Sequence, residues 1–197
     1  MREPPLTLGF DDDEDPERDF EREPPPTRGA AQAGPAPASR PSTRGFVVRT
    51  DGAARGNPGP ASSGAVLIDL ARADARDPRT TPDASISDYL GIQTNNVAEY
   101  TAVVRAVGLG IELGARRLEL LLDSKLIVEQ LTGRWRVKDA KLRILWADAL
   151  RLLRTLPDGW TATHVPRAQN SLADAKCNEA IDRVLAGGPS SVWVRPG

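Results

Sequence analysis

The hydrophobic pattern of the chain changes period several times after Phe46, and this succession is what most restricts the fold. Short β-branched or alternating runs predict strands, whereas longer stretches with apolar residues three or four apart predict helices. The predicted strands are FVVRTD, SGAVLIDL, ISDYLGIQ, RRLELLLD and WTATHVPR. The predicted helices are TNNVAEYTAVVRAVGLGIELG, SKLIVEQLTG, DAKLRILWADALRLLRTL and SLADAKCNEAIDRVLAGG. The order β-β-β-α-β-α-α-β-α indicates one α/β domain over residues 46–187, with a mixed five-stranded sheet flanked by helices.

Residues 1–45 differ from this domain in composition. They hold 9 of the 17 prolines, and their ten acidic residues and six arginines give a net charge of −4. Too little apolar surface is available there to offset the entropy cost of ordering, so we expect a disordered acidic tail. Such a tail could aid solubility, compete with nucleic acid or bind a partner. Residues 188–197 are expected to form a C-terminal tail whose VWV patch docks on the domain or on another protein.

The sequence favours a cytoplasmic protein that stays off membranes. No run approaches the roughly 18 consecutive apolar residues of a membrane-spanning helix. The first twenty residues lack the apolar core of a secretory signal, and a single cysteine, Cys177, cannot form an internal disulfide. Nothing in the sequence demands a protein partner, so we expect a monomer.

Four acidic residues are conspicuous by their positions in the predicted elements. Asp51 and Asp123 are predicted to end strands, and Glu99 and Asp174 lie in the first turns of helices. Open α/β sheets gather their ligand sites at strand ends and at the helix starts that follow them. The four carboxylates are therefore expected to converge in one pocket.

Converging carboxylates repel one another and raise one another's pKa, so the arrangement needs cations. Oxygen ligands without a Cys or His cluster select hard Mg²⁺ or Mn²⁺ over zinc. Two such ions about 4 Å apart stabilise both the attacking and the leaving oxygen in phosphodiester cleavage. The expected cofactor is a pair of Mg²⁺ ions, with Mn²⁺ as the alternative.

The four acids lie in blocks that resemble a known family. The blocks are TDGAARGNPGP, TNNVAEY, LLLDSKL and VPRAQNSLAD. In this order they are similar to the signature blocks of type 1 ribonucleases H, in the compact bacterial and archaeal branch, over about residues 46–186. The resemblance implies a ribonuclease H-like fold and hydrolysis of the RNA strand of RNA–DNA hybrids, leaving 5′-phosphate and 3′-hydroxyl ends.

The resemblance also implies a role for each acid. Asp51 would bridge both ions, Glu99 and Asp123 would complete the site of one, and Asp174 would help to hold the other. Glu99 would in addition sense a 2′-hydroxyl, which only RNA offers.

Further residues match family positions that contact the substrate. Asn57, Asn95 and Asn96 would reach nucleotides in the minor groove, and Thr94 would hold a phosphate of the DNA strand. Asn95 and Asn96 could equally serve as helix caps. Trp135 lies in the basic stretch GRWRVKDAK, where it could stack on the DNA strand or be a buried residue at a solvated helix start.

The only histidine, His164, is a candidate proton shuttle. His164 precedes Asp174 by ten residues, as a mobile catalytic histidine does in longer family members, but it falls within an alternating strand. We therefore interpret His164 as a residue on the face of the sheet. Arg167, at the end of that strand, is the better candidate for assisting metal or phosphate chemistry.

Two other functions remain open on the sequence alone. One is a related nuclease that acts on duplex DNA or also cuts double-stranded RNA. The other is a non-catalytic nucleic-acid-binding module on the same fold. The complete set of four acids argues against the second alternative.

Overall fold

The computed structural model describes residues 44–196, whose strands form one mixed sheet of six strands. The strand order is β5-β4-β1-β2-β3-β6, in which β5, β4 and β1 are parallel and the other neighbours are antiparallel. The elements in chain order are β1 (Gly45–Ala54), β2 (Gly59–Asp69), β3 (Ala84–Gln93), α1 (Asn95–Glu112), β4 (Arg117–Leu122), α2 (Lys125–Leu131), α3 (Ala140–Leu153), β5 (Trp160–His164), η1 (Arg167–Gln169), α4 (Ser171–Leu185) and β6 (Ser191–Val194).

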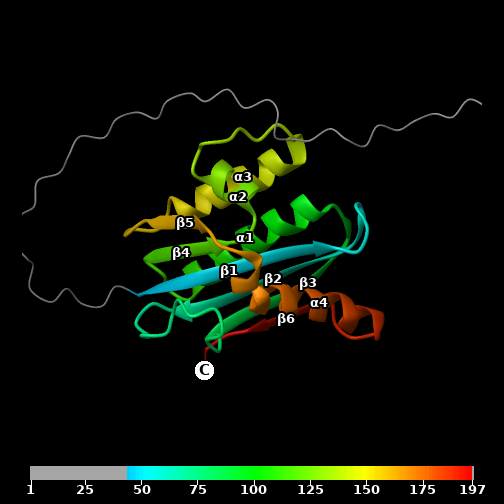
Figure 1. Cartoon of the computed structure of the whole chain (residues 1–197), viewed down its shortest axis with the longest axis horizontal. Helices are drawn as coiled ribbons and strands as arrows, with labels where there is room; N and C mark the ends of the chain where they lie inside the picture. The colour runs from blue at the N-terminus through cyan, green and yellow to red at the C-terminus, as the bar shows by residue number, and fades with distance from the viewer. Residues whose placement is uncertain (1–43, 197) are drawn as a thin grey trace, which may run out of the picture. The chain divides into compact units, whose positions relative to one another are not determined.

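The helices cover the two faces of the sheet unequally. Figure 1 shows α1, α2 and α3 on one face and α4 on the other. The main core lies between α1, α3 and the sheet, where Phe46, Tyr100 and Leu120 are among its fully buried members. Burial on both faces explains the near-continuous apolar sequence of β4. The predicted α/β architecture is confirmed.

The sheet has one more strand than expected. Ser191–Val194, placed by the sequence in a C-terminal tail, forms β6 and pairs antiparallel with β3. Its position is held by Asp88 of β3, which is 1% exposed and accepts hydrogen bonds from the Trp193 indole Nε1 (2.9 Å) and the Ser191 hydroxyl. The expectation of five strands was wrong because β6 has only four residues, too few to show a period.

Strand β1 is also longer than expected. The sequence placed Asp51 at its end, but β1 continues to Ala54 and pairs with β2 up to Ala54–Ala61. The block GAARGNPGP has the glycine and proline content of a turn, yet its first residues continue the antiparallel ladder. Asp51 is therefore inside a strand. The parallel ladder with β4 does end there, at the pair Thr50–Leu122.

Two further expectations concern membrane-spanning helices and the acidic N-terminal tail. Within residues 44–196, no helix is long and apolar enough to cross a membrane. The acidic tail expected over residues 1–45 lies, apart from its last two residues, outside the described residues.

Candidate active site

The candidate site is centred on Asp51, where the parallel half of the sheet ends. Because Thr50 and Leu122 are the last parallel pair, Asp51 and Asp123 are the next residues of two neighbouring chain segments. Asp51 is only 6% exposed, and its carboxylate oxygen Oδ2 is buried without a hydrogen-bond partner among the described residues. The sheet thus presents one carboxylate in a dry position beside a second one.

Two glycines allow helices to approach Asp51 from both sides. A Cβ on Gly52 would lie 2.0 Å from the backbone nitrogen of Glu99 in α1. A Cβ on Gly64, the partner of Asp51 in β2, would lie 2.3 Å from the carbonyl oxygen of Ala173 in α4. Glu99 itself, and Asp174 next to Ala173, can come close to Asp51 only because neither glycine has a side chain.

The electrostatics of Asp51 show the same convergence. Burial, followed by the charges of Asp123 and Asp174, raises the pKa of Asp51 to about 7; Glu99 adds to the rise and Arg167 opposes it. Burial is also the main reason why the pKa of Glu99 is raised. Without a cation, the site disfavours the charged form of its central carboxylate.

The other three acids have polar partners. Glu99 Oε1 accepts a hydrogen bond from Asn95 Nδ2 (2.8 Å), and Asp123 Oδ1 accepts one from Asn170 Nδ2 (2.7 Å). Asp174 is bound by two donors, Arg167 Nη2 at 2.7 Å and Asn178 Nδ2 at 3.0 Å. These hydrogen bonds fix the orientation of the three carboxylates.

The residues at the site suit a divalent cation. Among residues 44–196, no three Asp, Glu, His or Cys side chains are close enough together to ligate a metal ion in this arrangement. The orphaned, buried Oδ2 of Asp51 nevertheless lacks the positive partner that its position demands. Glu99, Asp123 and Asp174 offer carboxylate oxygens, the ligands that Mg²⁺ and Mn²⁺ prefer. Rotation of the surrounding carboxylates towards Asp51 would complete such a set.

Asn170 is a site residue that the sequence interpretation missed. Its side chain is 1% exposed, and its amide nitrogen donates both to the Thr50 carbonyl oxygen (2.8 Å) and to Asp123 Oδ1. Asn170 thereby joins the start of α4 to Thr50 within β1 and to Asp123 just after β4. An asparagine at the predicted start of a helix was the available signal, and it also fits a simple cap.

We expect Asn170→Asp to destabilise the protein and to reduce its activity. The change places another buried carboxylate beside Asp123 and removes the donor to Thr50, which should lower the free energy of unfolding by about 2–3 kcal/mol. Urea unfolding measures this loss. Asn96→Asp, an exposed residue of α1, is the matched control and should change stability by less than about 0.5 kcal/mol. Equal stability of the two variants would contradict the role of Asn170.

The candidate substrate contacts lie around the start of α1. Thr94 is the N-cap and its side chain accepts from the Val97 amide (3.4 Å), while Asn57 Oδ1 accepts from the Asn95 amide (3.2 Å). Asn95 also binds Glu99, and Asn96 is exposed. The GNPG segment and the helix start therefore form one surface beside Glu99.

Trp135 lies in the loop between α2 and α3 and is half-buried. The Lys125 ammonium is 5.6 Å from the centroid of its ring, a cation–π contact near the start of α2. A tryptophan that stacks on DNA would be exposed, and a structural one would be buried. The partial exposure of Trp135 lies between these two expectations.

His164 and Arg167 lie on opposite sides of a short turn. His164 lies in β5, as predicted, but the strand ends at this residue and not at Arg167 as expected; its Nε2 is 3.2 Å from the backbone oxygen of Asp123. Arg167 begins η1 and pairs with Asp174, with 76% of its side chain exposed. The pair with Asp174 raises the pKa of the Arg167 guanidinium, so it stays charged. Arg167 is thus available to an anion that approaches Asp174.

Comparison with known families gives a match over most of the described chain. A family described as "Reverse transcriptase-like" matches residues 49–180. Ribonuclease HI of Halobacterium salinarum is 45% identical over 95 residues, which is 48% of this chain and 47% of that protein. The chain therefore spans about half the length of this curated relative.

Solved structures match more completely. The crystal structure of RNase H1 from Halobacterium salinarum is 42% identical, with a TM-score of 0.63, and the match covers 70% of this chain and 98% of the other. LC11-RNase H1, solved in complex with an RNA/DNA hybrid, is 35% identical, with a TM-score of 0.63 and coverage of 71% and 99%. The fold and the order of its elements are shared with these structures.

Proposed function

Because the chain belongs to the type 1 ribonuclease H family, we propose that it hydrolyses the RNA strand of RNA–DNA hybrids, leaving 5′-phosphate and 3′-hydroxyl ends. The observation that carries the proposal is the buried carboxylate of Asp51, which lies next to Asp123 at the end of the parallel ladder and is approached by the Glu99 and Ala173 backbones at Gly52 and Gly64. A relative of the same fold was solved with an RNA/DNA hybrid, which supports this substrate.

The four acids are the proposed ligands of two Mg²⁺ ions, for which Mn²⁺ could substitute. Bound cations would supply charge stabilisation at the reacting phosphate and a water of lowered pKa. Asp51 would be the central ligand, because the charges of the other three carboxylates all act on it. Arg167 holds Asp174 through its Nη2 and directs its remaining donors to solvent, where a phosphate oxygen could accept them.

The surface beside Glu99 is proposed to recognise the RNA strand. Asn95 fixes the Glu99 carboxylate, and Asn57 is joined to the same helix start. Hydrogen-bonding groups in this position can contact a 2′-hydroxyl, which DNA lacks. Thr94, Asn96 and Trp135 complete the proposed substrate contacts. All of these groups come from one chain, so the active form is proposed to be a monomer.

The test is a cleavage assay with substrates labelled on either strand. Full-length protein would be incubated with hybrid, duplex RNA and duplex DNA in Mg²⁺ or Mn²⁺, and with chelator. We expect cuts in the RNA strand of the hybrid, with 5′-phosphate ends, and none in chelator. Binding of hybrid without cleavage would favour a non-catalytic module, and preferential cleavage of either duplex would favour a different nuclease.

A further inference from the structure

A buried arginine lies two residues before Asp51 on the same strand. Arg49 of β1 is 1% exposed, although the residues before it in the strand are apolar. Arginine is among the residues least often fully buried, because its charge must be removed from water. Its position therefore calls for a specific set of acceptors.

Arg49 joins two segments that are far apart in the sequence. Its Nη1 donates to the carbonyl oxygen of Gln169 (2.8 Å), and its Nη2 donates to the carbonyl oxygen of Arg76 (2.9 Å). Gln169 ends η1, and Arg76 lies in the loop between β2 and β3. The planar guanidinium holds both carbonyl groups in a fixed relation.

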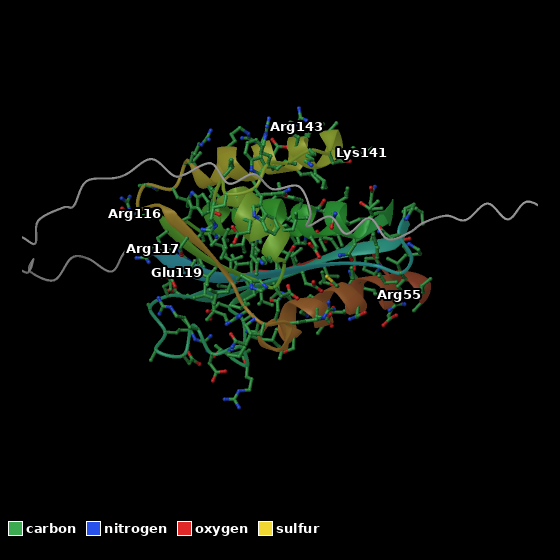
Figure 2. All side chains as sticks on the ribbon, turned by 45° about the horizontal axis from the view of Figure 1, so that its top comes forward. Arg55, Arg116, Arg117, Glu119, Lys141 and Arg143 are labelled. Atoms are coloured by element: carbon green, nitrogen blue, oxygen red, sulfur yellow. The ribbon has the colours of Figure 1, made fainter. Side chains whose placement is uncertain are left out.

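The loop between β2 and β3, which holds Arg76, is itself bound to strand β4. Arg76 donates through Nε and Nη2 to Glu119 of β4 (both 2.9 Å), and Glu119 is only 8% exposed. Figure 2 shows Glu119 near Arg116 and Arg117, at the end of the sheet away from Arg55. Arg49 therefore connects η1, through the loop between β2 and β3, to Glu119 of the neighbouring strand β4.

The other side of the connection leads directly to the site. Gln169 lies between Arg167, which binds Asp174, and Asn170, which binds Asp123 and Thr50. A shift of η1 would move both side chains at once. The backbone bonds within this three-residue helix run from Gln169 to Pro166 and from Asn170 to Arg167, so Arg49 adds a contact from β1 to the middle of this segment.

We propose that Arg49 is a positioning residue, which fixes η1 through the Gln169 carbonyl so that Arg167 and Asn170 align Asp174 and Asp123. The inference rests on the proposed function, because the aligned groups are its proposed metal ligands. An apolar residue at position 49 would match its neighbours in β1, but it would leave two carbonyl groups without donors.

The test combines kinetics with amide hydrogen exchange on the full-length protein. Arg49→Met should lower kcat on hybrid about ten- to a hundredfold with KM within about threefold, because misplaced groups impair the reaction more than binding. In the metal-free protein, amides of residues 165–174 should exchange about tenfold faster. Arg49→Lys keeps the positive charge but loses the planar guanidinium that donates to two carbonyl groups at once. If Arg49→Met fails to fold, Arg49→Lys should show the same changes.

A double-mutant cycle separates positioning from general stability. Arg167→Ala should lower kcat about tenfold or more in the wild type, but by less than about threefold when Arg49 is already Met, since coupled residues are not additive. Arg183→Met is the control: Arg183 also donates to a backbone oxygen, Ser87 O at 2.6 Å, but ties α4 to β3. It should lower the melting temperature and leave kcat within about threefold.

The outcomes distinguish this inference from the proposed function. Additive effects of the two changes, or unchanged exchange over residues 165–174, would overturn the role of Arg49 while a cleaving wild type upholds the function. A wild type that does not cleave hybrid would refute the function, and the exchange measurement would still decide whether Arg49 holds η1.

Discussion

Asp51→Asn is expected to abolish turnover of hybrid while making the metal-free protein more stable. The amide keeps the shape of the side chain but cannot bridge two cations, so kcat should fall roughly a thousandfold or more, as for other essential catalytic groups. The same change removes a buried charge that has no partner. Loss of activity and gain of stability in one variant are what a metal site predicts and what a structural carboxylate does not.

The gain in stability should depend on pH. The pKa of Asp51 is about 7 in the folded protein and near its ordinary value of 3.8 in the unfolded chain. The folded state therefore holds the proton more tightly, and ionisation costs stability as pH rises from about 4 to about 7. Well above pH 7, Asp51→Asn should raise the free energy of unfolding by roughly 4 kcal/mol, because the pKa changes from 3.8 to about 7 and each tenfold change in proton affinity corresponds to about 1.4 kcal/mol; near pH 4 the substitution should have little effect.

Thermal unfolding with and without divalent cation measures both effects. Mg²⁺ or Mn²⁺ should raise the melting temperature of the wild type, because ligands of the folded state stabilise it, and should do so far less for Asp51→Asn. Asp158→Asn, which alters a carboxylate paired with Arg116 away from the site, is the control and should retain activity. A variant at position 51 that cleaves at the wild-type rate would remove Asp51 from the mechanism.

The second large effect is expected from the smallest possible change, Gly52→Ala. The added Cβ would lie 2.0 Å from the Glu99 nitrogen and 2.3 Å from the Ala98 carbonyl carbon, both backbone atoms that cannot rotate away. Helix α1 must move or β1 must bend, which should cost about 3 kcal/mol or more. Because the displaced residue is Glu99 itself, activity should fall at least about tenfold even in molecules that fold.

Gly108→Ala is the matched control on the same helix. Apart from the backbone of α1 itself, no atom of residues 44–196 lies within 4 Å of the Cβ that alanine would add at Gly108. Alanine at this helical position should therefore raise stability by about 0.5–1 kcal/mol. Urea unfolding and a hybrid cleavage assay would compare the two variants. If Gly52→Ala matched Gly108→Ala in both measurements, the close approach of β1 and α1 would not be what places Glu99.

Sequence reasoning failed where the signal was short or non-local. Strand β6 has four residues, so no period could reveal it, and its anchor Asp88 lies about a hundred residues earlier. The extension of β1 past Asp51 was hidden by the turn-like composition of its last residues, which only pairing with β2 makes extended. Asn170 and Arg49 are single residues whose roles depend on partners about 120 positions away.

The amino-acid sequence alone determined the α/β class and most strands and helices, because local periodicity encodes these properties; it also predicted the four acids as candidate ligands from their positions. Only the tertiary structure decided how the acids meet. Gly52 and Gly64 let α1 and α4 close on Asp51 from two sides, and Asn170 and Arg49 join the segments between them. These contacts depend on backbone atoms of distant elements coming within a few ångströms, and a linear pattern of residues carries no information about such distances.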